Sequence, residues 1–364
     1  MKSLTWIITQ ASVEPLVAPL TQPFRTALGD HQTLDNLLFK IQTGKNDYYY
    51  GEAAVASHIT GETVSGTEKN LKIVADWLIG KDIRQYPLIS AQLHEQWERN
   101  PALIAAVETA VFDALTAQLG IPLWKLFGDC CRKIRSDITI VIADLDETQM
   151  SVKKFYQQGF RMFKVKVGRN FDLDIKRVEA VNRIAPKGAI YLDANQGFNA
   201  TQMLKFLREI KRLKIPIALL EQPVPRENFE DLVKVTRSTD IPVCADESAR
   251  GIEDVVRIIQ EKAANVINIK LMKTGIVESL EIIRLARASN IGLMIGGMLE
   301  SSIAMTASAH IAAGSGYFRY VDLDTPFFIK DEVSHNPYLS KNGIYDLSGV
   351  KKGIGIKIIP RKVN

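Results

Sequence analysis

From residue 136 onward, short apolar runs alternate with stretches in which apolar residues recur every three or four positions. The short runs are typical of buried strands, and the longer spacing is typical of amphipathic helices. Ile175, Val178, Val181 and Ile184 follow the helical spacing. The apolar runs recur at a spacing of roughly 25 residues, which suits a repeated strand–helix unit. These runs centre on Ile140, Val165, Tyr191, Leu219, Val243, Ile267, Met294 and Tyr320.

Eight such units predict an α/β fold, a modified TIM (β/α) barrel that spans residues 126–329. A doubly wound open sheet is the alternative. Residues 1–125 predict an N-terminal α+β capping domain, because strand-like runs precede helices without alternating with them. The tail, residues 330–364, contains no further strand–helix unit, so we expect it to fold back and complete the capping domain.

In the N-terminal region, apolar residues alternate with other residues at Leu37, Phe39 and Ile41, and Tyr48–Glu52 predicts a partner strand after a turn. The pattern therefore predicts a β-hairpin. Two polar, glycine-containing stretches are too long for simple turns and are candidate substrate-covering loops. These loops are Leu16–Asp30 and Ala53–Glu62, and helices are predicted around 71–79, around 89–97 and from Pro101 to Gly120.

The composition is that of a globular protein and gives no indication of a nucleic-acid or membrane partner. The 364 residues are 46% hydrophobic and 24% charged, as in an ordinary globular protein, and the net charge of +5 is spread along the chain. With no basic block interleaved with aromatics, we expect no nucleic-acid partner. The apolar run within Met1–Gln10 is too short for a signal peptide, and we expect no membrane partner and a cytoplasmic location. Cys130, Cys131 and Cys244 lack the spacing of a zinc site and are expected to be free thiols.

The segment Phe163–Gly168 places two lysines on one face of a predicted strand. Lys164 and Lys166 are two residues apart, so both side chains point the same way. Two buried ammonium groups repel each other and lose hydration, so the fold must compensate them. An exposed edge strand with protective lysines is the alternative interpretation.

Charged residues end most of the later predicted strands, where the functional side chains of a barrel lie. Asp193, Glu221 and Asp246 end three consecutive strands. Adjacent strands lie about 4.8 Å apart, so three carboxylates would converge, and a hard divalent cation would neutralise them. We therefore expect one Mg²⁺ per subunit. Each acid taken alone could instead cap the helix that follows.

Lys270 ends the predicted sixth strand, which lies across the ring from the second strand and Lys166. A substrate carboxylate held on the metal would present its α-carbon between these two amines. The metal would stabilise an enediolate, and the lysines would remove and return the α-proton. Lys164 is expected to contact the carboxylate and to lower the pKa of Lys166 by like-charge repulsion. For Lys273 a solvated surface position is favoured over direct catalysis.

Together these motifs resemble the enolase superfamily, in its muconate-lactonising-enzyme-like subgroup. The resemblance covers essentially the whole chain and implies the two-lysine, Mg²⁺-dependent chemistry. Asp322 and Asp324 resemble the acid pair with which dipeptide epimerases hold the α-ammonium group of the substrate, although a helix-capping pair stays possible. The motifs are Lys164-x-Lys166, Asp193-Ala-Asn195, Glu221-Gln-Pro, Asp246-Glu-Ser and Asn268-Ile-Lys270.

Further matches suggest a substrate. Arg25, Thr139 and Met298 correspond to substrate-binding positions of L-Ala-D/L-Glu epimerases. The resemblance implies that Arg25 meets the acidic side chain of the dipeptide, and it places the reaction in murein peptide metabolism. An exposed loop arginine is the competing interpretation. Asn265 and Ile276 depart from the family pattern and weaken the substrate assignment more than the reaction class.

Three functions remain open from the sequence. The first is epimerisation of the C-terminal residue of a dipeptide, the expected small-molecule substrate, by a homo-oligomer. The second is o-succinylbenzoate synthesis or a muconate-type cycloisomerisation on the same metal site, for which Asp322 and Asp324 would have no ammonium group to hold. The third is a barrel that binds a ligand without catalysis.

Overall fold

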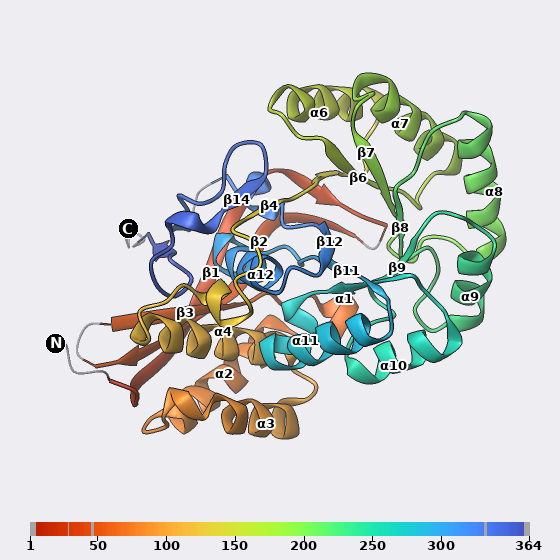
Figure 1. Cartoon of the computed structure of the whole chain (residues 1–364). Coiled ribbons are helices and arrows are strands. Elements are labelled where there is room, and N and C mark those ends of the chain that lie inside the picture. The colour runs from red at the N-terminus through yellow and green to blue at the C-terminus, as the bar shows by residue number, and fades with distance from the viewer. Residues whose placement is uncertain (1–4, 28, 45–46, 331–332, 360–364) are drawn as a thin grey trace.

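The computed structural model describes residues 5–27, 29–44, 47–330 and 333–359. Its centre is an eight-stranded sheet in which the strands follow one another in chain order and neighbours are parallel (Figure 1). All eight predicted strands are confirmed. They are β5 (Ile138–Ile140), β6 (Met162–Lys166), β7 (Ala189–Asp193), β8 (Leu219–Glu221), β9 (Val243–Ala245), β10 (Val266–Ile269), β11 (Gly292–Ile295) and β12 (Phe318–Val321).

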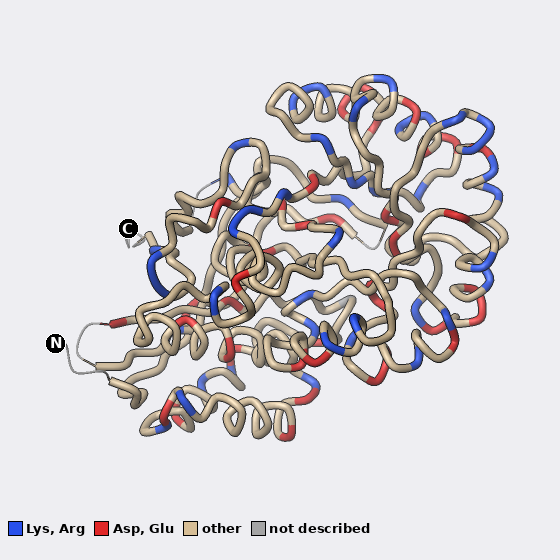
Figure 2. Tube along the Cα trace, viewed as in Figure 1, with Lys and Arg blue, Asp and Glu red and all other residues tan. Residues whose placement is uncertain are grey.

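Helices follow the first seven of these strands and cover the outside of the curled sheet (Figure 1). Most of them bury one apolar stripe, as Val255 and Ile258 do in α10 (Ile252–Glu261), whereas α12 (Ser302–Ser315) is buried almost all round. Charged residues of both signs lie along the helices that follow β5 to β10 (Figure 2). The helices are α6 (Leu145–Gln157), α7 (Phe171–Ile184), α8 (Ala200–Arg212), α9 (Phe229–Arg237), α10 (Ile252–Glu261), α11 (Leu271–Ala288) and α12 (Ser302–Ser315).

The eighth unit differs from the expectation, because β12 leads into a short 3₁₀ helix, η2 (Thr325–Phe328), in place of an α-helix. Two aromatic residues explain the turn: Phe327 packs edge-on against Phe160, and Phe328 against Phe24, each with 5.3 Å between ring centroids. The backbone N–H of Asp137 donates to the carbonyl of Val321 at 2.9 Å, which joins the first and last strands. The barrel is therefore a modified one.

The N-terminal region forms a three-stranded antiparallel sheet and a group of helices. The predicted hairpin is confirmed, and so are the three predicted helices. Leu16–Arg25 was expected to be a loop, which is wrong: it is the end of the long strand β1, paired residue by residue with β2 as far as Pro19. The elements are β1 (Ile8–Arg25), β2 (Asp30–Thr43), β3 (Asp47–Ala53), α1 (Ser57–Thr60), α2 (Val64–Leu78), η1 (Ile83–Gln85), α3 (Tyr86–Trp97), α4 (Pro101–Gln118) and α5 (Leu123–Leu126).

The C-terminal tail returns to the N-terminal sheet. Leu16, Ala18 and Leu34 form a buried cluster with Val333, against which Ile358 packs. The tail also adds a strand to a short segment before the barrel. Its elements are β13 (Ser334–His335), which pairs with β15 (Lys357–Ile358), η3 (Leu347–Gly349), and β14 (Ile344–Asp346), which pairs with β4 (Lys133–Arg135).

Among the described residues, no helix combines the length and the apolar character that crossing a membrane would require. The three cysteines are free thiols, with Cys244 buried and Cys130 exposed.

Candidate active site

Lys164 lies inside the barrel, surrounded by carboxylates. It is 1% exposed because β6 lies between β5 and β7, so the edge-strand interpretation is wrong. Its Nζ lies 2.6 Å from Asp322 Oδ2, 2.8 Å from Glu221 Oε2 and 3.0 Å from Asp193 Oδ2. Burial disfavours the ammonium form, but Asp193 and the other acids outweigh burial and raise the pKa of Lys164 well above its ordinary value.

Lys166 lies on the same face of β6, as the alternation of the strand predicted. Its Nζ donates to Asp193 Oδ2 at 2.6 Å and to Asn195 Oδ1 at 3.0 Å. The backbone carbonyl of Lys166 accepts a hydrogen bond from the buried guanidinium of Arg177 at 2.7 Å. Arg177 also donates to the carbonyl of Val141 at 2.6 Å, so one α7 side chain fixes the carboxyl ends of the first two barrel strands.

The three predicted metal ligands lie at the ends of β7, β8 and β9, and all are buried. Burial raises the pKa of Asp193, but Lys164 and Lys166 outweigh burial and lower the pKa to about 2. Burial and then the Asp193 charge raise the pKa of Glu221 to about 7. Crowded buried carboxylates of this kind cannot all hold a charge without cations nearby.

None of the three acids acts as the cap of the following helix in the described structure. The N-cap residues of α8, α9 and α10 are Asn199, Asn228 and Gly251. The capping interpretation is therefore wrong for this set, and the acids are left facing the barrel interior.

Lysine ammonium groups neutralise each predicted ligand: Lys164 lies beside Asp193 and Glu221, and Lys270 lies beside Asp246. Among the described residues, the acids that each place one oxygen within 4.8 Å of the others are Asp137, Asp322 and Asp324, and not these three. The donors nevertheless fit a hard cation, because they are buried carboxylate oxygens on adjacent strands. Glu247, beside Asp246, adds a buried Oε2 with no hydrogen-bond partner among the described atoms.

Lys270 follows β10 and reaches Asp246 Oδ2 at 2.7 Å. Burial disfavours its charge, but Asp246 outweighs burial and raises the pKa of Lys270. Lys273 was expected at the surface, which is wrong: it is 5% exposed, and its Nζ donates to Asp246 Oδ1 at 2.8 Å and to the carbonyl of Asn268 at 2.9 Å. The first turn of α11 directs Lys273 back toward the strand ends. Burial favours the neutral form of Asp246, but Lys270 and Lys273 outweigh it and lower the pKa of Asp246.

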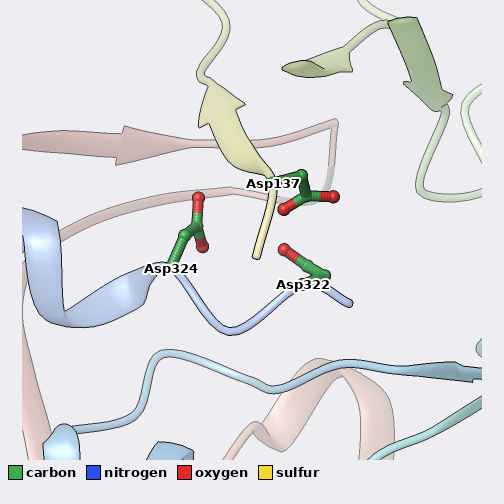
Figure 3. A group of neighbouring side chains, drawn as sticks. All are labelled: Asp137, Asp322 and Asp324. Carbon is green, nitrogen blue, oxygen red and sulfur yellow. The ribbon is translucent and has the colours of Figure 1, made fainter. Parts of the chain in front are cut away.

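Asp322 and Asp324 follow β12 and form a compact group with Asp137, which precedes β5 (Figure 3). Asp324 heads η2 without a side-chain capping bond and accepts the backbone N–H of Thr139 instead. The capping interpretation is thus wrong for Asp324. Burial and then the Asp322 charge raise the pKa of Asp324 to about 7, so this group favours a nearby positive charge.

One cavity collects most of the predicted residues at the carboxyl ends of the strands. Lys164, Lys166 and Lys270 line it on the barrel side, and β7, β8 and β9 lie between the two strands that carry them. The other predicted residues that line it are Thr139, Met298, Asp322 and Asp324.

Arg25 is not among the residues that line this cavity, contrary to the expectation. Successive side chains of a strand point to opposite faces, and the neighbouring Phe24 faces the cavity. Arg25 therefore points to the other side, where its Nη1 lies 3.3 Å from Glu147 Oε2 and it lines a separate hollow.

The sequence analysis gave no role to three groups in or beside the site, although two of them belong to its motifs. Asn195 lines the cavity and holds Lys166, Glu247 lies beside Asp246, and Asp137 faces Asp322. The feature of the sequence that could have identified them is their position within two residues of a barrel strand. Asn195 has a positive φ of 40°, a conformation uncommon outside glycine that often marks functional loops.

Comparisons with known proteins agree with this arrangement. A family described as enolase C-terminal domain-like matches residues 147–362. A hydrophobic dipeptide epimerase from Citrifermentans bemidjiense is 42% identical over 97% of this chain and 98% of its own length. An L-Ala-D/L-Glu epimerase from Thermotoga maritima is 38% identical over 80% of this chain and 84% of its own length.

A solved structure extends the likeness to three dimensions. The dipeptide epimerase from Enterococcus faecalis, complexed with Mg and L-Leu-L-Tyr, has a TM-score of 0.92 and 30% sequence identity. The match covers 96% of this chain and 99% of that one. With its enolase C-terminal-like barrel and relatives along nearly its whole length, the chain belongs to the enolase superfamily.

Proposed function

We propose that this enzyme is a Mg²⁺-dependent dipeptide epimerase that inverts the α-carbon of the C-terminal residue. The observation that carries the proposal is the single cavity in which Lys166 and Lys270, on strands separated by three others, face the same space as Asp322 and Asp324. Relatives named as dipeptide epimerases support the reaction class.

The chain's own residues account for the proton transfers. Lys166 takes the α-proton from one face of the carbon as a neutral amine, and Lys270 delivers a proton to the opposite face as an ammonium group. In the reverse direction the two lysines exchange these roles, so the substrate epimers interconvert. The α-ammonium group of the dipeptide lies against Asp322 and Asp324, which fixes the α-carbon between the lysines.

Asp193, Glu221 and Asp246 would hold the Mg²⁺, whose charge would stabilise the negative charge that develops on the substrate carboxylate. Lys164, which contacts two of these acids, adds a further positive charge on the same side. We likewise propose domain boundaries after residues 125 and 329. The homo-oligomeric state and the cytoplasmic location stay predictions.

Solvent-deuterium exchange tests the proposal. We expect deuterium at the α-position of the C-terminal residue when a panel of L-Ala-L-X dipeptides is incubated with Mg²⁺ and enzyme in D₂O and followed by mass spectrometry. Lys166→Ala and Lys270→Ala should each lower epimerisation by roughly 10²- to 10⁴-fold, the usual contribution of a general acid or base. Lys176→Ala, at an exposed position of α7, is the matched control. No exchange with any dipeptide would refute the proposal.

A further inference from the structure

The outer wall of the catalytic cavity is largely apolar. When the carboxylate of the dipeptide points at the strand ends, the side chain of its C-terminal residue points out of the barrel mouth. There it meets residues from the N-terminal region and from the loop after β11. The polar part of this wall is Thr26, His31, Thr33, Asp35 and Asn36. The remaining residues are apolar and offer a substrate only van der Waals contact. They include Phe24, Val55, Ile59, Met298 and Leu299.

The charged side chains of the cavity do not favour an anionic substrate side chain. Its acids, Asp35, Asp322 and Asp324, would repel one. Its lysines are engaged by the carboxylates of the barrel, as with Lys164 and Asp322 at 2.6 Å. His31 lies at the exposed rim and is included in the test below.

Arg25 does not supply the missing positive charge. The pleat of β1 turns Phe24 inward, where its ring packs against Phe328, and turns Arg25 outward. There the guanidinium lies 3.3 Å from Glu147 and 3.9 Å from Asp30, so two carboxylates already balance its charge.

We infer that this enzyme selects dipeptides whose C-terminal side chain is apolar, aliphatic or aromatic, and discriminates against an acidic side chain. The inference rests on the proposed epimerase function. A carboxylate placed against the apolar part of the wall would lose hydration there, and the lysines of the cavity are already paired with acids, so its burial would be costly. An apolar side chain of the same length loses nothing polar and gains buried area.

The experiment compares kcat/KM for L-Ala-L-Leu, L-Ala-L-Phe and L-Ala-L-Glu, each followed by deuterium incorporation in D₂O. We expect the apolar dipeptides to exceed L-Ala-L-Glu by at least about tenfold, within the range that pocket contacts of this kind provide. If L-Ala-L-Glu turned over as fast as or faster than the others, the selectivity would be refuted while the epimerase function stood. If no dipeptide exchanged, both would fall.

Variants of Arg25 and His31 test whether either residue determines the preference between acidic and apolar dipeptides. Arg25→Ala should leave the ratio of the L-Ala-L-Glu and L-Ala-L-Leu values unchanged within about twofold, and His31→Gln should do the same. Arg169→Ala is the matched control, because Arg169 also pairs with Asp30 from outside the cavity, at 2.7 Å. A selective loss of L-Ala-L-Glu turnover in Arg25→Ala or His31→Gln, absent in Arg169→Ala, would overturn the inference, and circular dichroism would verify that each variant is folded.

Discussion

At the residue scale, the site depends on which buried ammonium group faces which carboxylate. Lys270 and Lys273 are three residues apart and both bind Asp246, but on different oxygens. Lys270 lines the cavity, whereas Lys273 does not and also donates to two backbone carbonyls, those of Asp246 and Asn268. We therefore assign Lys273 to holding the end of β9 against β10, and Lys270 to chemistry.

Replacing Lys273 by methionine tests this division. Lys273→Met leaves Asp246 paired with Lys270 but removes the donor to two buried backbone carbonyls, so we expect the free energy of unfolding to fall by about 2–4 kcal/mol. Lys270→Met leaves Asp246 paired with Lys273 and both carbonyls bonded, so it should cost less stability while lowering turnover by roughly 10²- to 10⁴-fold. Urea unfolding followed by circular dichroism, together with an epimerisation assay, gives both quantities. Equal stability losses in the two variants would contradict the assignment.

Side-chain direction was the least predictable property at this scale. The shared face of Lys164 and Lys166 followed from strand alternation alone. Their contact with Asp193, which was expected to be a metal ligand, did not. Arg25 and Lys273 were misplaced for local reasons that the sequence pattern hides. Arg25 lies on a strand that was read as a loop, and Lys273 lies on the first turn of a helix whose start at residue 271 decides where its side chain points.

At the element scale, the barrel strands and the residues at their ends were predictable, whereas strand β1, which covers the site, was not. Most barrel strands are short apolar runs that end in a charge, which gives a strong signal. β1 gives a weak one, because it buries few of its side chains and carries Pro15, Pro19 and Pro23. Prolines suit an edge strand such as β1, but they also mark loops, and the register shift between Pro19 and Phe24 obscures the alternation further.

A single α4 carboxylate joins the N-terminal region to the helix that follows Lys270. Glu108 is 2% exposed, and its Oε2 accepts the backbone N–H groups of Ile276 and Val277 in α11. The residue before them, Gly275, has a positive φ of 67°, and a Cβ there would meet Glu108. The departure of Ile276 from the family pattern thus falls on a backbone position that Glu108 holds.

We expect Glu108→Met to leave two buried N–H groups without an acceptor. Each such loss costs about 1–3 kcal/mol, so the free energy of unfolding should fall by about 2–6 kcal/mol. Because the same turn positions Lys270, kcat should fall roughly tenfold with a smaller change in KM. Glu108→Gln keeps an acceptor oxygen and should restore most of both. A Met variant with wild-type stability and kcat would show that the contact has no structural role.

At the scale of the whole molecule, three distant segments meet at His310. The ring lies fully buried in α12, and its Nδ1 accepts the backbone N–H of Trp124 at 3.0 Å. Its Nε2 lies 3.0 Å from the carbonyl of Ile354 in the tail, so Nε2–H is the donor there. A neutral ring satisfies both contacts, and burial lowers the pKa of His310 to about 3. The tail's return to the barrel therefore depends on an uncharged imidazole.

This dependence predicts a loss of stability in acid. Since the folded pKa of His310 lies below its unfolded value near 6.5, the unfolded chain binds more protons, and stability falls as pH falls from about 6.5 toward 3. Between pH 7 and pH 5 the loss of stability from His310 is about 2 kcal/mol, so His310→Gln should flatten the pH dependence of urea unfolding by that amount.

His94 is the control of opposite sign. Glu108 raises the pKa of His94 despite burial, so the contribution of His94 to stability is present below pH 6.5 and is lost as pH rises through the folded pKa. His94→Gln should accordingly steepen the acid loss, and the same slope in His310→Gln as in the wild type would contradict the role given to this ring.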